Sequence, residues 1–240
     1  MTKTKFDSIY HDLKEKIENQ EYLFQELLPS ENTLVSIYNC SRNTIRRAIS
    51  FLAEEGYVQS IHGKGVYVIY KPVEQANFSI GGIESFKESA IRNHRQYHTK
   101  VIQFTEITAD ERIAKKTGFI EGAELYFIQR VRYLDGKALI LDINLFLKEV
   151  VPGLTKEIAE NSIYEYIENV LGMSIITSKR RITVERVTQI DEKYLELNDY
   201  NCLAVISSQT YNANGLMFEY TQSRHRPDYF CFQDTAIRKR

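Results

Sequence analysis

The stretch from Ser41 to Gly65 constrains the fold of this 240-residue chain more than any other part of it. After Ser41, apolar residues recur at helical spacing, and they are Ile45, Ala48, Ile49 and Leu52. Ser41 is a favourable N-cap, because its hydroxyl can accept a hydrogen bond from an amide of the first turn. Two segments rich in β-formers follow, at 57–61 and 66–70, and the turn between them is His62-Gly63-Lys64-Gly65. The stretch therefore predicts a helix followed by a β-hairpin.

The face of this helix that lies opposite the apolar stripe is cationic. It carries Arg42, Asn43, Arg46, Arg47 and Ser50. An ordinary amphipathic helix with a solvated basic face is one explanation, and the helix taken alone favours it. The residues before it favour another explanation, because Ser30 can cap a short helix that turns tightly into the cationic one. Two helices, a tight turn and a hairpin together predict a winged helix-turn-helix, a fold that binds DNA.

Charge, cysteine spacing and hydropathy exclude several classes of protein. The formal net charge is −1, so any contact with DNA must come from a local basic patch. The three cysteines, Cys40, Cys202 and Cys231, have no paired spacing, so we expect neither a disulfide framework nor a metal site. The N-terminus lacks the apolar core of a signal peptide, and no apolar run approaches membrane length. We expect a cytoplasmic protein with no membrane partner and no cofactor.

A polar segment at 71–78 contains Pro72 and shows no periodicity, which is typical of a linker. Beyond it, strand patterns dominate and short helices interrupt them. We expect strands at 99–108, 125–133, 138–147, 174–188, 203–211 and 217–226, with a last strand at 229–232 that finishes the sheet. We therefore predict a winged helix-turn-helix domain at 1–70, the linker at 71–78, and an antiparallel α+β domain at 79–240.

Both halves resemble known modules. The runs L-P-S-E-N-T-L, S-R-N-T-I-R-R-A-I-S-F-L-A-E-E-G-Y and H-G-K-G-V-Y-V resemble the DNA-binding domain of the GntR family of bacterial transcription regulators. The runs G-G-I-E-S-F-K-E, R-V-R-Y-L-D-G-K, N-S-I-Y-E-Y-I and F-E-Y-T-Q-S-R-H-R resemble the UTRA effector domain of its HutC subfamily, which shares its fold with chorismate lyase. Within the subfamily, S-F-K-E, N-S-I-Y-E-Y-I-E and T-Q-S-R-H-R-P-D are most similar to trehalose-operon repressors of Gram-positive bacteria.

This resemblance implies a homodimeric repressor of a sugar-utilisation operon. Such a protein binds palindromic double-stranded operator DNA and leaves it when a phosphorylated sugar binds, and trehalose 6-phosphate is the expected effector. The expected DNA contacts are Ser30, Ser41, Arg42, Asn43, Thr44, Arg46, Arg47, His62, Gly63 and Lys64. Arg42 and Arg46 are expected at guanine edges or nearby phosphates, and the hairpin turn is expected in the minor groove.

The expected effector site begins with two arginines. Arg130 and Arg132 lie two residues apart in a predicted strand, so their side chains share one face. That face could point to solvent, or the guanidiniums could grip an anion such as phosphate. The resemblance implies phosphate contacts for Ser85, Phe86, Lys87, Arg130 and Arg132. It implies contacts with the rest of the effector for Asp142, Ser162, Tyr164, Glu219 and His225.

The hairpin after the arginines decides which residues share their face. We expect a three-residue loop, Leu134-Asp135-Gly136, which pairs Tyr133 with Lys137 and places Asp142 and Asn144 on the arginine face. A two-residue loop would place them on the opposite face. We prefer the three-residue loop, because the leucine-rich opposite face then forms a clean core.

A lyase-type enzyme is the competing function, because the lyase shares this fold. The sequence contains no G-x-S-x-G elbow, no H-E-x-x-H zinc motif and no phosphate loop of the G-x-x-x-x-G-K type. Its five histidines are scattered along the chain. We therefore predict no catalytic residue and expect a regulator. A regulator that responds to an amino-sugar phosphate or a small carboxylate is the alternative within the same fold.

Overall fold

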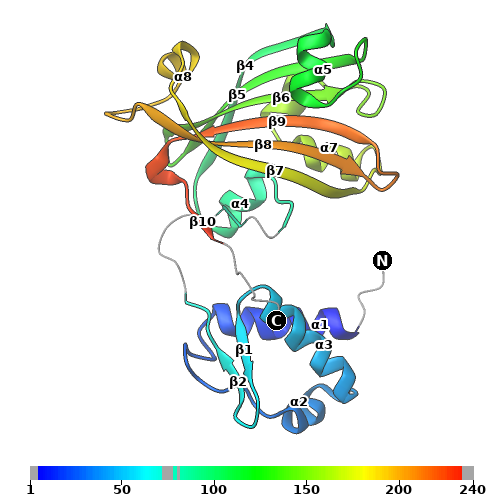
Figure 1. Ribbon diagram of the computed structural model, residues 1–240, viewed down its shortest axis with the longest axis vertical. Coiled ribbons are helices and arrows are strands. Elements are labelled where there is room, and N and C mark those ends of the chain that lie inside the picture. The colour runs from blue at the N-terminus through cyan, green and yellow to red at the C-terminus, as the bar shows by residue number, and fades with distance from the viewer. Residues whose placement is uncertain (1–4, 72–77, 80–81, 234–240) are drawn as a thin grey trace. The chain divides into compact units, whose positions relative to one another are not determined.

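The computed structural model describes residues 5–71, 78–79 and 82–233, and the chain divides into two compact units (Figure 1). The first unit comprises residues 1–74 and 233–240, and the second comprises residues 75–232. Residues 72–77 of the predicted linker lie outside the described residues. Among the helices that the structure describes, none is long and apolar enough to cross a membrane.

The first unit is a winged helix-turn-helix. Its helices are α1 (Lys5–Glu18), α2 (Glu31–Tyr38) and α3 (Arg42–Glu54), and its wing consists of β1 (Val58–Ile61) and β2 (Gly65–Val68). The core joins the apolar stripes of the three helices to the base of the wing. Its buried residues include Ile9, Leu13, Ile17, Leu34, Ile45, Ala48, Leu52, Val58 and Val68.

Two serines and an asparagine determine where α2 and α3 begin and where α2 ends. Ser30 and Ser41 are the N-caps, and each hydroxyl accepts a hydrogen bond at 3.2 Å from the amide three residues later. Asn39 ends α2 with φ of 45°, a left-handed conformation that asparagine tolerates better than most residues. The chain therefore turns within three residues into α3, and the face of α3 opposite the core is left exposed.

The wing depends on two glycines. Gly63 has φ of 73° at the tip of the turn, where a left-handed residue closes the hairpin. Gly65 has φ of 115°, and a Cβ atom there would lie 3.0 Å from Cδ2 of Leu27. A side chain at either position would strain the backbone, so the turn between β1 and β2 requires both glycines.

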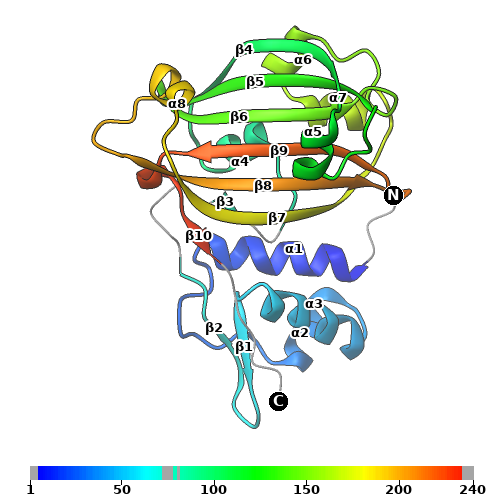
Figure 2. The ribbon, with the colours of Figure 1, turned by 45° about the horizontal axis from the view of Figure 1, so that its top comes forward.

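The second unit is built on a six-stranded antiparallel sheet with the order β4-β5-β6-β9-β8-β7 (Figure 2). The strands are β4 (Tyr97–Thr108), β5 (Glu124–Leu134), β6 (Lys137–Leu147), β7 (Ile175–Arg186), β8 (Cys202–Asn212) and β9 (Met217–His225). With the helices between these strands, the observed architecture confirms the predicted α+β class.

The prediction that residues 229–232 finish this sheet was wrong. After β9 the chain forms a 3₁₀ turn, η1 (Pro227–Tyr229), and then β10 (Phe232–Gln233) pairs with β3 (Phe78–Ser79) in a separate two-stranded sheet. The physical reason is Pro227, which has a fixed φ and no amide to donate to a ladder. The chain therefore leaves the six-stranded sheet directly after His225.

Short helices cover both faces of the six-stranded sheet. They are α4 (Phe86–Arg92), α5 (Glu111–Thr117), α6 (Lys156–Glu160), α7 (Ile163–Asn169) and α8 (Gln189–Tyr194). On one face, Ala159 of α6 and Ile163 of α7 pack on Ile128 and Phe146 of the sheet. On the other face, α5 and α8 cover two further apolar clusters. The five-residue α6 was not predicted, because it is too short to show a helical periodicity.

The loop between β5 and β6 differs from the prediction. Leu134 pairs with Lys137, so the loop contains two residues, Asp135 and Gly136, both with positive φ. The three-residue loop was therefore wrong, and the left-handed preference of an Asp-Gly pair explains the shorter loop. A bulge between Arg132 and Tyr133 then shifts the register and places Arg130 opposite Asp142. The bulge reverses the effect of the shorter loop, and Asp142 lies on the arginine face after all.

Candidate effector pocket and DNA interface

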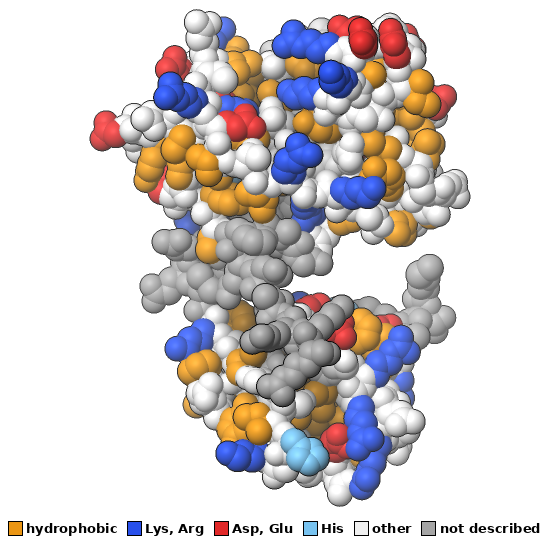
Figure 3. Space-filling model, viewed as in Figure 1, with side chains coloured by type: hydrophobic (Ala, Val, Ile, Leu, Met, Phe, Trp, Pro, Cys, Tyr) orange, Lys and Arg blue, Asp and Glu red, His pale blue; other side chains and the backbone are white. Residues whose placement is uncertain are grey.

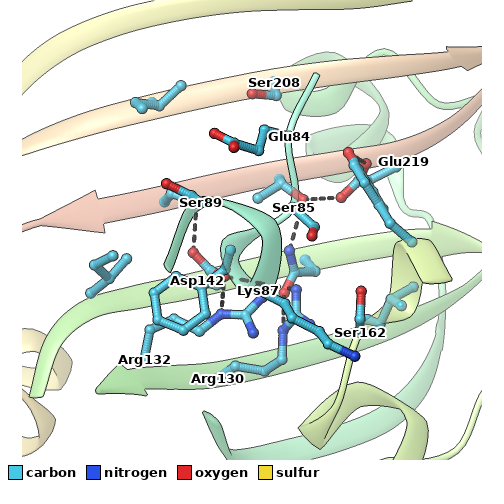
Figure 4. Close-up of a pocket in the computed structure, with 18 of the residues that line it drawn as sticks. Glu84, Ser85, Lys87, Ser89, Arg130, Arg132, Asp142, Ser162, Ser208 and Glu219 are labelled. Carbon is cyan, nitrogen blue, oxygen red and sulfur yellow. Dashed lines mark hydrogen bonds and ion pairs between the residues drawn. The ribbon is translucent and has the colours of Figure 1, made fainter. Parts of the chain in front are cut away.

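A pocket lies on the face of the sheet that α4 and α7 cover (Figure 4). All ten residues predicted to bind the effector line it. They are Ser85, Phe86 and Lys87 at the start of α4, Arg130 and Arg132 of β5, Asp142 of β6, Ser162 and Tyr164 at the start of α7, and Glu219 and His225 of β9. The fold therefore gathers into one cavity residues that lie between Ser85 and His225 in the sequence.

The two arginines form a buried cationic pair. The exposed fraction is 4% for Arg130 and 7% for Arg132. Nε of Arg130 donates to Oδ1 of Asn144 at 2.9 Å, and Nη1 of Arg132 donates to Oγ1 of Thr99 at 2.7 Å. Burial and the neighbouring Arg132 charge lower the pKa of Arg130 to about 9. Because burial and repulsion both oppose its charge, a bound anion would be favourable here.

Asp142 is the counterion of this pair. Its Oδ2 accepts from Nε of Arg132 at 2.8 Å and lies 3.7 Å from Nη2 of Arg130. Its Oδ1 accepts from the hydroxyl of Ser223 at 2.6 Å. Burial opposes the charge of Asp142, but the two arginines overcome it and hold the pKa of the carboxyl below its ordinary value. In this structure, Oδ2 of Asp142 holds the two arginines in position, and Oδ1 is held by Ser223.

A chain of hydrogen bonds crosses the floor of the pocket from Arg130 to Tyr164. Nδ2 of Asn144 donates to Oγ1 of Thr221 at 2.7 Å, and Thr221 donates to Oε1 of Glu219 at 2.6 Å. The Tyr164 hydroxyl donates to Oε2 of Glu219 at 2.7 Å. Burial and the Glu219 charge raise the pKa of Tyr164 well above its ordinary value, so the phenol remains a donor. The floor is therefore ordered by the protein's own contacts.

The remaining predicted residues lie at the starts of α4 and α7 and at the end of β9. Nζ of Lys87 lies 2.7 Å from Oε2 of Glu165, so an ion pair joins α4 to α7. Ser85 and Ser162 are the N-caps of these two helices. His225 is buried, and burial lowers its pKa to about 4, although the charge of Asp142 acts in the opposite direction. The imidazole is therefore neutral near pH 7.

The predicted DNA-contacting residues fall mostly on one exposed surface of the first unit. Arg42, Asn43 and Arg46 are exposed on α3, and Figure 3 shows Lys and Arg side chains gathered around α2 and α3. Nε of Arg46 lies 3.1 Å from both carboxylate oxygens of Glu31, at the start of α2. An acidic residue therefore holds Arg46 in place on the surface that the helix-turn-helix presents.

The other predicted DNA contacts divide into three groups. Ser30, Ser41 and Thr44 lie at the starts of α2 and α3, where the serines act as caps. His62, Gly63 and Lys64 form the exposed tip of the wing. Arg47 lies apart from both groups, because its guanidinium stacks 3.8 Å above the ring of Phe6 in α1. The structure brings Arg42 and Arg46 together but gives Arg47 an aromatic partner.

Family models match both units of the chain. The model described as "Bacterial regulatory proteins, gntR family" matches residues 5–68, and the model of the UTRA domain matches residues 92–231. The second match alone covers more than half of the chain. The chain belongs to the GntR family and carries a UTRA domain. This GntR-family protein is accordingly a transcriptional regulator and not an enzyme.

Individual relatives agree with this assignment. The chain is 39% identical to the HTH-type transcriptional regulator TreR of Bacillus subtilis, over 99% of both chains. It is 29% identical to the mannosyl-D-glycerate transport/metabolism system repressor MngR of Escherichia coli, over 95% of this chain and 93% of that one.

Two solved structures show similar folds. The possible transcriptional regulator YydK of Bacillus subtilis superposes with a TM-score of 0.80 at 24% identity, over 98% of this chain and all of that one. The effector-binding domain of the Bacillus subtilis trehalose repressor superposes with a TM-score of 0.54 at 38% identity, over 60% of this chain and 99% of that one. The first likeness covers both units of the regulator, and the second covers the effector domain.

Sequence reasoning missed part of the pocket lining. The missed polar residues are Glu84, Ser89, Asn161, Ser178, Arg180 and Ser208. Ser178 and Arg180 alternate along β7, which is the only signal that the sequence offers for their shared face. Their pairing with β8 cannot be read from the sequence, because α8 and a long connection separate the two strands.

Proposed function

We propose that this protein represses an operon for trehalose use and that trehalose 6-phosphate releases it from its operator. In this proposal, residues 1–70 bind DNA, residues 71–78 link the domains, and residues 79–240 bind the effector and form a homodimer in the cytoplasm. One recognition helix contacts few base pairs, and helix-turn-helix proteins commonly meet this limit by binding palindromes as dimers.

The convergence of ten predicted residues on one pocket carries this proposal. The buried pair Arg130 and Arg132 suits a phosphate, because guanidiniums form bidentate hydrogen bonds with it. Glu219 and Tyr164 on the same floor suit the hydroxyls of a sugar. The likeness to TreR over the whole chain, and to the effector-binding domain of the trehalose repressor, supports trehalose as the sugar. An effector that releases DNA must bind the DNA-free arrangement more tightly, and such coupling is typically about 1–3 kcal/mol.

A gel shift with and without ligand tests this function. Trehalose 6-phosphate should weaken operator binding by the wild type, and Arg132→Ala should remove that response while the operator is still bound. Arg132→Lys serves as a second variant, because it keeps the charge that faces Asp142 but loses the planar fork. If the wild type keeps its operator with trehalose 6-phosphate but releases it with glucosamine 6-phosphate or a small carboxylate, the proposed effector is wrong and the regulator assignment stands.

A further inference from the structure

The pocket extends well beyond the arginine pair, along a row of polar residues that crosses four strands. In this row Asn144 of β6 pairs with Thr221 of β9, Thr221 pairs with Ser208 of β8, and Ser208 pairs with Arg180 of β7. Residues paired in this way share one face of the sheet, and all four line the pocket. Three strand spacings separate Asn144 from Arg180, which is roughly 14 Å. The floor therefore continues far past the site expected for a phosphate.

The far end of this row is a second polar cluster, distinct from the arginine pair. Ser178 and Arg180 come from β7 and Ser208 comes from β8, and all three line the pocket. Figure 4 shows Ser208 and Glu84 on the opposite side of the pocket from Arg130 and Arg132. Arg180 pairs with Ser208 across β7 and β8, so these two side chains share the pocket face of the sheet. We call Ser178, Arg180 and Ser208 the distal cluster.

The charges around the distal cluster favour a neutral ligand group. Two carboxylates, Glu84 and Glu219, line the pocket together with Arg180. Glu84 forms an ion pair with Arg92 at 2.8 Å, so Glu219 is the carboxylate whose charge would repel a second anion. The oxygens of both carboxylates can accept hydrogen bonds from hydroxyls. The guanidinium of Arg180 supplies donors, and the serine hydroxyls can donate or accept. This mixture of donors and acceptors suits a polyhydroxylated ring without charge.

We propose that Ser178, Arg180 and Ser208 form a subsite for a second, uncharged sugar ring, so that the pocket selects disaccharide monophosphates over monosaccharide phosphates. This inference rests on the proposed function, because it assumes that the arginine pair holds the phosphate. The phosphate and the first ring then lie over Arg130, Arg132 and Asn144, and the second ring lies over the distal cluster. In this arrangement, Arg180 contacts the second ring and not the phosphate, so it selects ligands that are long enough to carry that ring.

Calorimetric titration of the full chain with two ligands tests the subsite. The wild type should bind trehalose 6-phosphate more tightly than glucose 6-phosphate. Arg180→Met should weaken trehalose 6-phosphate binding by about ten-fold or more, because it removes hydrogen bonds from a charged group. It should leave glucose 6-phosphate binding unchanged, which also shows that the variant is folded. Arg181→Met is the matched control, since Arg181 is the exposed neighbour on β7 outside the pocket lining.

Each other outcome contradicts a defined part of the inference. If Arg180→Met weakens both ligands equally, Arg180 acts on the phosphate or on the fold, and the subsite is wrong. If it weakens neither ligand while the wild type prefers the disaccharide, the second ring lies elsewhere, and the subsite is also wrong. If the wild type binds neither sugar phosphate, the proposed function fails and the subsite fails with it.

Discussion

Nε of Arg132 donates a hydrogen bond to the Asp142 carboxylate at 2.8 Å, and neither side chain is more than 8% exposed. Asp142 also lies 3.7 Å from Arg130, so a single negative charge serves two buried guanidiniums. The cluster of Arg130, Arg132 and Asp142 therefore has a net positive charge, and its hydrogen bonds hold it in place without a bound anion. The pocket therefore needs little rearrangement to bind a phosphate, which reduces the cost of ordering on binding.

Asp142→Asn should destabilise the effector domain, because it removes the carboxylate that pairs with both buried arginines. Breaking a buried ion pair from one side typically costs about 3–5 kcal/mol. Inorganic phosphate should recover part of this loss, and it should raise the melting temperature of the variant more than that of the wild type. Urea denaturation and thermal melts with and without phosphate measure both effects.

Asp135→Asn is the matched control for this prediction. Asp135 also pairs with an arginine, Arg95, but Asp135 is exposed and Arg95 is partly exposed, so solvent screens the pair. Its removal should change the free energy of unfolding far less than the removal of Asp142. Equal losses in the two variants would contradict the role given to Asp142, and so would a phosphate effect no larger in Asp142→Asn than in the wild type.

His225 should make the effector domain less stable in mild acid. Burial lowers its pKa from 6.5 to about 4, so below pH 6.5 the unfolded chain binds a proton that the folded chain excludes. Stability is therefore lost as the pH falls from 6.5 towards 4, by about 2 kcal/mol at pH 5. The variant His225→Gln cannot titrate and should lack this part of the pH dependence.

The comparison of wild type and His225→Gln isolates this one group. Asp142 also has a lowered pKa, but its contribution is lost only as the pH falls below its ordinary value of 3.8. Groups that the two proteins share cancel in the difference. Urea denaturation at pH 7 and pH 5 is the measurement, and parallel losses in the two proteins would contradict the prediction.

Local chemistry made the helix starts and the arginine face predictable. Ser30 and Ser41 are N-caps in the structure, as their hydroxyls and the residues after them predict. The spacing of Arg130 and Arg132 placed them on one face, whatever the rest of the sheet did. These features depend on interactions between residues at most four positions apart, so they can be predicted from the sequence alone.

Features that depend on distant partners were not predictable. The bulge beside Arg132 decides the face of Asp142, yet no residue near Leu139 signals it. The prediction reached the right face from a wrong loop, because the shorter loop and the bulge compensate each other. Arg180 lines the pocket because β7 pairs with β8, and a long connection separates these two strands in the sequence. The distal cluster therefore exists only because two strands that are distant in the sequence pair in the sheet.

Arg46→Ala should weaken operator binding, because Arg46 is exposed on α3 and suited to a guanine edge or a phosphate. The expected loss is about 5- to 150-fold in affinity for the operator. Arg47→Ala is the comparison, since its guanidinium stacks on Phe6 and its loss should affect the stability of the unit more than base recognition. Footprinting and titration at one salt concentration test both variants, and an Arg46→Ala protein that protects DNA like the wild type would contradict the assignment.

Substitutions at Lys87 and Glu165 should change effector affinity in opposite directions. The Lys87 ammonium is bound by Glu165 at 2.7 Å, so it must leave that carboxylate to meet a phosphate. Glu165→Gln removes the competitor and should tighten binding a few-fold, and Lys87→Met should weaken it because one cation is lost. Calorimetry with trehalose 6-phosphate measures both changes.

The double variant decides whether Glu165 acts through Lys87. If it does, Glu165→Gln should have no effect once Lys87 is methionine, and the double variant should match Lys87→Met alone. Additive effects would mean that Glu165 repels the phosphate directly, and the ion pair between α4 and α7 would then have no part in binding. Tighter binding by Lys87→Met would show that Lys87 does not contact the phosphate, because the loss of a contacting cation must weaken phosphate binding.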